Sequence, residues 1–372
     1  MAVARSSPSA GVRWLLLFVI LVVQFALLEA GLRLYGSFEG TTTFQSLFTT
    51  HPQVGVVLRP GAQIRYTTVE FTTDIAINAQ GVRDDAPLGP KLPGERRVLV
   101  LGDSLVLSVQ VPLAQTFCMD LERRLNARVG SEERWRVING GVQGYGPVQE
   151  WFYFDKIAAA FQPDIVLIVA FVGNDAIEAA DMAPWLEHGR PLEDQQPTLN
   201  QMRRIVRSSV VLQYARMRWD QLRSRWATGT PERPLSSYLS DPPPVVGQGL
   251  EISRKAFGLI ADRARGVGAR TAIALMPARF QTDDADFGRL SEIVRQAGGE
   301  LVRNSASERF RTTLAPLGLP MVDLQPALAA QHDRVGLFFQ RNVHLTPRGH
   351  DVVAGALFEF LESSGLTKAA GR

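Results

Sequence analysis

Four short motifs in this sequence carry groups that could perform acyl-transfer chemistry. A serine hydroxyl is a poor nucleophile unless a histidine accepts its proton, and Ser104 and His344 supply that pair of residue types. Glycine N–H groups and asparagine amides can stabilise the oxyanion that forms when a serine attacks a carbonyl, and Gly144 and Asn174 offer such donors. The four motifs are Gly102-Asp103-Ser104, residues 139–144 (NGGVQG), Gly173-Asn174-Asp175 and residues 342–344 (NVH).

Each motif also has a structural explanation when it is taken alone. Serine is a common N-cap residue, so Ser104 could simply cap a helix. Asparagine and aspartate are common in turns, so Asn174 and Asp175 could simply turn the chain. A lone histidine is commonly a hydrogen-bonded structural residue, which is the role that we expect for His350. The spacing of the glycines disfavours two other kinds of site, an α/β-hydrolase nucleophile elbow and a dinucleotide-binding loop. Val106 stands where the G-x-S-x-G nucleophile elbow needs a glycine, and the glycine-rich stretch lacks the G-x-G-x-x-G order of a dinucleotide loop.

The motifs fall at the ends of predicted strands in an alternating pattern of strands and helices. Short runs rich in Val, Ile and Leu, separated by helices, predict parallel strands buried on both faces and therefore an α/β domain. Because ligands bind beyond the carboxyl ends of parallel strands, the motifs should meet at one edge of the sheet. The predicted strands are 96–102, 134–140, 164–172, 269–276 and 319–324, and the predicted helices are 114–129, 147–160, 250–266, 286–299 and 347–363.

The predicted α/β domain spans residues 95–364, and a stretch at 176–249 interrupts its alternation as an insertion. Residues 36–94 are predicted to form a small β-rich lead-in and linker, because the segment TTVEFTTDIAIN alternates polar and apolar residues. Residues 365–372 are expected to be a C-terminal tail. Within the insertion, residues 201–226 have the spacing of an amphipathic helix with seven arginines and one acid. This pattern fits a lid with a solvated polar face, or a surface that binds an anionic membrane or glycan.

The N-terminal region has the composition of a membrane anchor. Residues 14–28 read WLLLFVILVVQFALL, with one polar member. We expect an uncleaved signal anchor over residues 14–35, since the only cleavage-like site has a bulky residue where a small one is preferred. A cleaved signal peptide is the alternative. Because arginines and no acids precede the apolar run, residues 1–13 should stay in the cytoplasm. The expectation is a single-pass protein of the inner (cytoplasmic) membrane with a periplasmic catalytic domain.

The composition of the whole chain disfavours several classes of protein. Forty Lys and Arg against 37 Asp and Glu give a net charge of +3, a small excess for a nucleic-acid-binding protein. A single cysteine, Cys118, excludes an internal disulfide and a multi-cysteine metal site. The five histidines lack the H-E-x-x-H spacing of a zinc hydrolase. We therefore expect chemistry without a metal or an organic cofactor.

In order and spacing, the four motifs resemble those of the SGNH/GDSL hydrolase superfamily over about residues 95–363, apart from the insertion. Ser104 matches the nucleophile of the G-D-S block, Gly144 and Asn174 match the glycine and asparagine of the next two blocks, and His344 matches the histidine of the last. The resemblance implies a flavodoxin-like αβα sandwich, here with a five-stranded parallel sheet, and an oxyanion hole shared by Ser104, Gly144 and Asn174. The segments AINAQGVRDD and VQVPLAQTFCMDLERRL also resemble membrane-anchored bacterial members.

One position departs from the pattern of that family. The family has an aspartate two or three residues before the histidine, where this sequence has Asn342 and Arg341. Asparagine can orient a neutral imidazole but brings no charge to stabilise imidazolium, and the equivalent change in a serine protease lowers kcat about 10⁴-fold through the wrong tautomer. Three possibilities follow: Asn342 suffices, another carboxylate such as Asp323 or Asp333 replaces the missing one, or the site is impaired.

The resemblance implies a serine esterase that acts on ester bonds through a covalent acyl-enzyme on Ser104, with His344 as the base. The alternatives are an O-acyltransferase with the same site, or a catalytically impaired SGNH-like domain that only binds. Together with the predicted anchor, this suggests acylated glycans or lipids of the cell envelope as ester-bearing substrates. The sequence leaves the substrate and the oligomeric state open.

Overall fold

The computed structural model describes residues 10–39, 44–128, 133–189, 209, 211–212, 215 and 233–368. The chain divides into two compact units, of which one comprises residues 1–42 with 193–228 and the other residues 43–192 with 229–372. The candidate site lies wholly within the second unit.

The first unit contains α1 (Ala10–Glu39), in which the stretch Gly11–Leu32 is long and apolar enough to cross a membrane. The carboxylate of Glu29 on this helix accepts hydrogen bonds from the Ser209 hydroxyl at 2.8 Å and from the Val211 N–H at 3.0 Å. The amphipathic helix predicted at 201–226 lies outside the described residues, apart from positions 209, 211, 212 and 215.

The second unit is built on a five-stranded parallel sheet with the strand order β6-β5-β7-β8-β9. This is the 2-1-3-4-5 order of flavodoxin-like folds, so the predicted fold class is confirmed. The order reverses between β5 and β7, which are neighbours in the sheet although β6 lies between them in the chain. The strands are β5 (Glu95–Gly102), β6 (Arg134–Gly141), β7 (Ile165–Phe171), β8 (Arg270–Met276) and β9 (Met321–Asp323).

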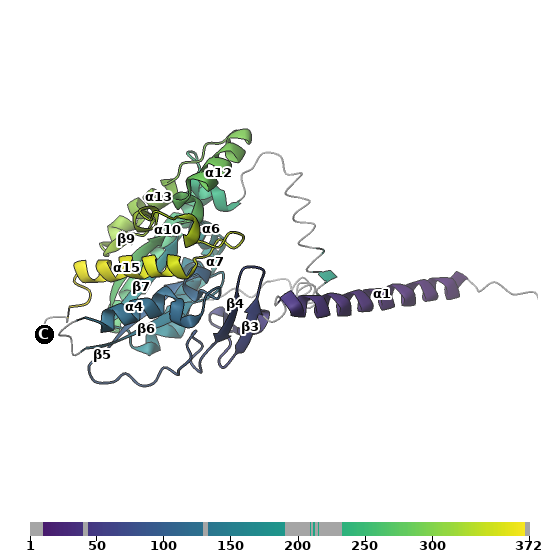
Figure 1. Ribbon diagram of the computed structural model, residues 1–372, viewed down its shortest axis with the longest axis horizontal. Coiled ribbons are helices and arrows are strands. Elements are labelled where there is room, and N and C mark those ends of the chain that lie inside the picture. The colour runs from purple at the N-terminus through teal and green to yellow at the C-terminus, as the bar shows by residue number, and fades with distance from the viewer. Residues whose placement is uncertain are drawn as a thin grey trace, which may run out of the picture. The chain divides into compact units, whose positions relative to one another are not determined.

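Helices cover both faces of the sheet, as continuous apolar strands require (Figure 1). Alternate residues of β5 enter different cores: Leu99 and Leu101 join the core under α5, α10 and α13, while Val98 and Val100 join the core under α4, α14 and α15. The helices of the second unit are α3 (Ser104–Leu107), α4 (Phe117–Asn126), α5 (Pro147–Lys156), α6 (Asp175–Asp181), α7 (Ala183–His188), α10 (Pro244–Gly266), α11 (Arg279–Thr282), α12 (Asp284–Gln296), α13 (Ser305–Leu314), α14 (Gln325–Ala329) and α15 (Pro347–Ser363).

The lead-in before the sheet consists of two antiparallel hairpins, β1 (Phe48–His51) with β2 (Gly55–Leu58) and β3 (Gln63–Thr67) with β4 (Thr72–Ala76). In β4 the burial alternates along the strand, as the alternating sequence predicts: Thr73 and Ile75 are buried, while Thr72 and Asp74 are exposed. The apolar side chains of these hairpins belong to the same core as α5 and α10. The lead-in is therefore packed into the second unit.

The structure differs from the predicted elements mainly at the borders of the insertion. α10 begins at Pro244 rather than at residue 250, since proline is favoured in the first turn of a helix. α6 starts at Asp175, after a short turn that follows β7, and packs against α10. The approach is so close that a Cβ on Gly249 would lie 1.6 Å from the Ala176 carbonyl oxygen. Helix α13 was not among the predicted elements, because its sequence, SASERFRTTL, has few apolar positions.

Candidate active site

The four motifs meet at the carboxyl edge of the sheet, where the strand order reverses. Ser104 follows β5 directly, Gly144 follows β6, and Asn174 follows β7. In open α/β sheets this reversal leaves a crevice beyond the strand ends, because the connections leave in opposite directions. The position of the site therefore follows from the topology.

Ser104 is presented by a tight turn between β5 and the short helix α3. The Asp103 carboxylate caps this helix by accepting the Leu105 N–H at 2.8 Å. Glycine is required before this cap, since a Cβ on Gly102 would lie 2.4 Å from Cγ2 of Val106. The turn fixes the backbone of Ser104, and burial reduces the exposed fraction of the residue to 9%.

A chain of hydrogen bonds links the nucleophile candidate to the last motif. The Ser104 hydroxyl lies 2.8 Å from Nε2 of His344, and Nδ1 of His344 lies 2.5 Å from Oδ1 of Asn342. Ser104 and His344 are 240 residues apart in the sequence. The structure thus brings together the serine, histidine and asparagine named from the sequence.

The contacts of Asn342 determine which imidazole nitrogen carries the proton. The backbone N–H of His344 also points at Oδ1 of Asn342, at 3.3 Å. Since a backbone N–H can only donate, the facing atom must be the amide oxygen, and Nδ1 of His344 must then be the protonated nitrogen. Nε2 is left with a free lone pair toward the Ser104 hydroxyl, which is the tautomer that a general base needs.

The other candidate acids are engaged elsewhere. Asp323 lies at the end of β9, where its carboxylate accepts the Gln325 N–H at 3.0 Å and faces Arg311 at 3.9 Å. Asp333 forms an ion pair with Arg348 at 2.5 Å. Asn342, rather than either aspartate, is the residue bonded to His344.

His344 and His350 differ in what their rings contact. Burial lowers the pKa of His344 to about 4, so its ring is neutral and able to accept a proton at neutral pH. His350 is fully buried in α15, and its Nδ1 accepts the Phe117 N–H at 3.2 Å while its ring stacks on that of Phe117. The contacts of His350 are those of a packed interior residue.

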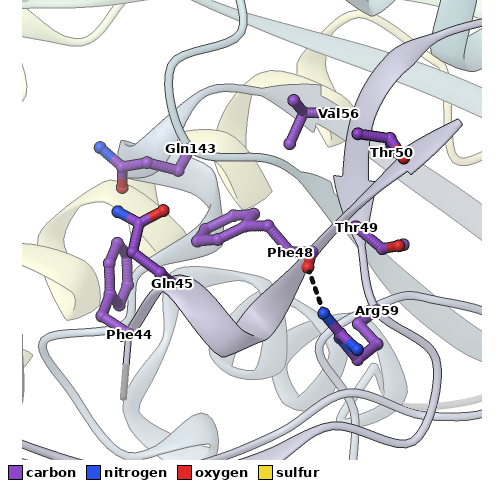
Figure 2. A pocket seen from close by; sticks show the side chains of 8 residues that line it. All are labelled: Phe44, Gln45, Phe48, Thr49, Thr50, Val56, Arg59 and Gln143. Atoms are coloured by element: carbon purple, nitrogen blue, oxygen red, sulfur yellow. Dashed lines mark hydrogen bonds between the residues drawn. The ribbon is translucent and has the colours of Figure 1, made fainter. Parts of the chain in front are cut away.

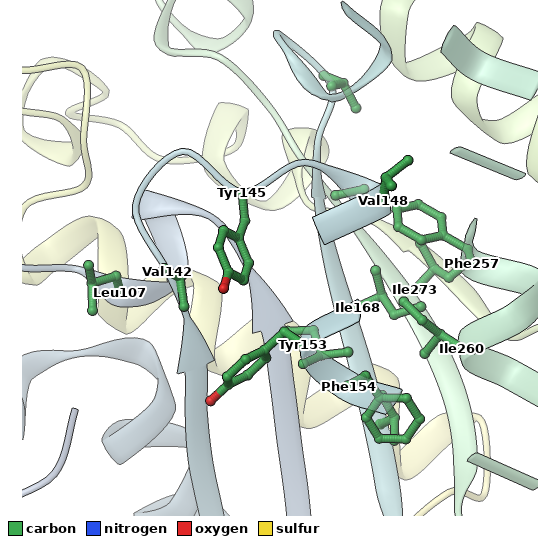
Figure 3. Packing of buried hydrophobic residues seen from close by; sticks show 14 of the residues in the cluster. Leu107, Val142, Tyr145, Val148, Tyr153, Phe154, Ile168, Phe257, Ile260 and Ile273 are labelled. Atoms are coloured by element: carbon green, nitrogen blue, oxygen red, sulfur yellow. The ribbon is translucent and has the colours of Figure 1, made fainter. Parts of the chain in front are cut away.

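The glycine-rich stretch, residues 139–144, is anchored to the core by its neighbours, while Gly144 itself is exposed. The Asn139 side chain donates to the Val106 carbonyl at 2.7 Å, which ties β6 to α3. Val142 and Tyr145 direct their side chains into the core beside Leu107 (Figure 3). Between them Gly144 is exposed and has a φ of +71°, a conformation that favours glycine. The backbone N–H of Gly144 is therefore carried by a well-anchored loop.

Asn174 leads into a cluster of buried acids that the sequence analysis did not identify. Its side-chain amide donates to the Glu178 carboxyl at 2.8 Å, which uses one of the two amide hydrogens. Burial and the nearby Asp103 raise the pKa of Glu178 to about 8, while the hydrogen bond from Asn174 opposes this shift. Burial also raises the pKa values of Asp175 and Glu150. The helical spacing of Asp175 and Glu178 was the available signal, but only the fold shows that Glu150 joins them.

The lead-in contributes two further residues near the site, Arg83 and Glu70, which the sequence analysis also missed. The buried Arg83 guanidinium donates to the carbonyl of Leu107, the last residue of α3, at 3.0 Å and to the carbonyl of Val111 at 2.7 Å. The Glu70 carboxylate accepts the N–H groups of Arg341 and Asn342. The lead-in therefore contacts both the segment that begins with Ser104 and the loop that carries Asn342.

A pocket of about 470 Å³ opens beside the glycine-rich loop (Figure 2). Gln143, the residue next to Gly144, forms part of its wall. The hairpin of β1 and β2 forms another part of the wall, and next to it Arg59 donates to the Phe48 carbonyl at 3.1 Å. The lining is mixed, with two aromatic rings, one aliphatic side chain, two amides, two hydroxyls and one guanidinium. These residues are Phe44, Gln45, Phe48, Thr49, Thr50, Val56, Arg59 and Gln143.

Comparisons with known proteins found similarity at the level of structure. No family model and no curated protein matches the sequence. The structure aligns with TesA at 13% identity and a TM-score of 0.41, over 72% of this chain and 99% of TesA. It aligns with a protein assigned to the lipolytic G-D-S-L family from Desulfitobacterium hafniense at 14% identity, over 71% and 99% of the two chains, with a TM-score of 0.39. It also aligns with a lipase/acylhydrolase from Enterococcus faecalis at 14% identity, over 72% of this chain and 96% of that protein, with a TM-score of 0.40.

Proposed function

We propose that this chain is a serine esterase of the SGNH/GDSL type. The observation that carries the proposal is the continuous chain from Ser104 through His344 to Asn342, with the histidine in the tautomer that can accept the serine proton. The alignment of these three residues supplies a nucleophile, a base and a group that orients the base.

The reaction follows from these positions. Oγ of Ser104 attacks the ester carbonyl carbon while its proton moves to Nε2 of His344. The resulting oxyanion is stabilised by the N–H groups of Ser104 and Gly144 and by the second amide hydrogen of Asn174. When the tetrahedral intermediate collapses, the bond to the alcohol breaks and His344 returns the proton to that alcohol. Water then attacks the acyl-Ser104 ester by the same steps and releases the carboxylic acid.

The pocket beside Gly144 favours a sugar-bearing ester. Flat aromatic faces and uncharged hydrogen-bonding groups together suit a carbohydrate ring, which has apolar C–H faces and a rim of hydroxyls. Phe48 and Gln143 offer these two kinds of contact. If a sugar hydroxyl instead of water accepts the acyl group, the same site is an O-acyltransferase. The apolar helix α1 supports placement at a membrane, and the arginines before it support a periplasmic catalytic unit.

The decisive experiment is reaction of the detergent-solubilised full chain with a fluorophosphonate probe, followed by product analysis with acetylated oligosaccharides. We expect covalent labelling of one serine and release of acetate, or transfer of acetate to an added sugar. A folded chain that neither labels nor releases acid would contradict the esterase proposal and favour a domain that only binds.

Phe48→Ala tests the pocket. We expect KM for an acetylated oligosaccharide to rise roughly fivefold, since the loss of an aromatic contact costs about 1 kcal/mol, while kcat stays the same. Turnover of p-nitrophenyl acetate, which has no sugar ring for the pocket to bind, should not change. Leu92→Ala, at a 54% exposed linker residue, is the control. Equal loss on both substrates would exclude a binding role, and a gain in selectivity for fatty-acyl esters would favour a lipid.

Glu178→Gln tests the acids behind Asn174. Because the pKa of Glu178 is raised to about 8, the group is neutral below that pH and negative above it. A negative charge bonded to the Asn174 amide opposes the formation of an oxyanion, so kcat/KM should fall as the pH rises through about 8. Glutamine keeps the acceptor without the charge, and the alkaline decline should disappear. Glu251→Gln, on the exposed side of α10, should leave the profile unchanged.

A further inference from the structure

The hairpin β3–β4 of the lead-in contacts the loop that carries Asn342 and His344. Oε1 of Glu70 accepts the Arg341 N–H at 2.9 Å, and Oε2 accepts the Asn342 N–H at 2.8 Å. One carboxylate thus holds two consecutive peptide groups, the second of which belongs to the residue that orients the histidine. Hydrogen bonds to a charged acceptor are stronger than neutral ones, so this contact restrains the loop.

The turn that presents Glu70 is itself well fixed. The hydroxyl of Thr68 accepts the N–H groups of Glu70 and Phe71, each at 3.2 Å, and the Thr68 N–H donates to the Phe71 carbonyl at 2.8 Å. Beside these bonds, the ring of Phe71 lies 5.4 Å from the ring of Phe339. The hairpin therefore makes both a polar and an aromatic contact with the loop.

On the other side of the contact, the loop backbone folds back on itself. The Phe339 N–H donates to the His344 carbonyl at 2.9 Å, and Phe338 pairs with Leu345 in an isolated bridge. These bonds close the base of the loop, while Glu70 holds its tip at residues 341 and 342. Among the described residues, the Arg341 and Asn342 N–H groups donate to Glu70 and to no other acceptor.

We propose that Glu70 is a positioning residue of the proposed esterase: by binding the Arg341 and Asn342 N–H groups, it sets the Asn342 side chain against Nδ1 of His344. This inference rests on the proposed function, and it assigns a catalytic contribution to the lead-in outside the α/β domain. Because the carboxylate acts through backbone groups, it does not touch the substrate. Its effect should fall on kcat and leave KM for a small ester unchanged.

The test is a double-mutant cycle in the full chain. Glu70→Ala should lower kcat for p-nitrophenyl acetate roughly 10- to 100-fold, the range expected when a catalytic group is misplaced by about 1 Å. In an Asn342→Ala background, where orientation of His344 is already lost, the same change should cost less than about twofold. Asp74→Asn, at an exposed residue of the same hairpin that pairs with Arg65, is the matched control and should be neutral. An undiminished loss in the Asn342→Ala background, or no loss in Glu70→Ala, would overturn the inference.

A readout without turnover separates this inference from the esterase proposal. Long-range ¹H–¹⁵N spectra of histidine-labelled protein report the tautomer of His344. We expect Nδ1–H in the unaltered chain and in Asp74→Asn, and a mixture of tautomers in Glu70→Ala. An unchanged spectrum in Glu70→Ala would refute the positioning role even if the chain were active. A changed spectrum in a chain that never labels with fluorophosphonate would support the positioning role and reject the esterase.

Discussion

Ser104→Ala should abolish fluorophosphonate labelling and lower ester turnover by roughly 10⁴-fold or more, because the proposed mechanism forms its acyl-enzyme on the Ser104 hydroxyl. The serine lies 2.8 Å from Nε2 of His344, and its hydroxyl is the only part that the substitution removes. Residues of one catalytic unit act together, so His344→Ala should cost about as much, and the double variant little more than either single variant. Labelling stoichiometry by intact-protein mass and steady-state kinetics measure these effects.

Ser108→Ala is a suitable comparison for the serine substitution, since Ser108 lies at the end of the same short helix but donates to the Leu105 carbonyl at 2.6 Å. Its labelling should match that of the unaltered chain. Persistent labelling in Ser104→Ala, or additive losses in the double variant, would show that the nucleophile lies elsewhere.

Substitutions at Asn342 should have the second largest effects, and they should go in opposite directions. Asn342→Leu keeps the approximate volume but removes the acceptor for Nδ1–H of His344, so either tautomer becomes possible and kcat should fall about 10³-fold. Asn342→Asp keeps the acceptor and adds a charge that stabilises imidazolium. Because about 1.36 kcal/mol of transition-state stabilisation is a factor of ten, kcat should rise roughly tenfold.

The pH profile distinguishes this explanation from a change in stability. Burial holds the pKa of His344 at about 4, so the base is neutral above this pH and the acid limb of the kcat/KM profile should lie at about pH 4. An aspartate at position 342 favours the protonated ring and raises this pKa, so the acid limb should move to higher pH. An unmoved acid limb, or slower turnover in Asn342→Asp, would contradict the view that the asparagine limits the base. Asp323→Asn, at a residue bonded to Gln325 instead, should change neither.

Much of the fold could be predicted from local pattern. Apolar runs such as VLVL before Gly102 have one stable placement, inside a sheet covered on both faces, and the alternation of strands and helices makes that sheet parallel. The borders of the insertion were less predictable. The pairing of α6 with α10 depends on close packing at Gly249 against Ala176, a contact between segments that are far apart in the chain.

The sequence by itself determined which residue types follow each strand, and therefore that a serine, a glycine, an asparagine and a histidine would face one sheet edge. The sequence could not decide whether Asn342 or Asp323 would lie against the histidine. Asp323 ends a strand and Asn342 precedes the last helix, so both were expected near that edge. Only the tertiary structure distinguishes their contacts: the Asn342 amide lies 2.5 Å from Nδ1 of His344, while the Asp323 carboxylate accepts the Gln325 N–H. The contacts of Glu70 with the Arg341 and Asn342 N–H groups were equally hidden, because packing between separate elements sets them and local sequence does not.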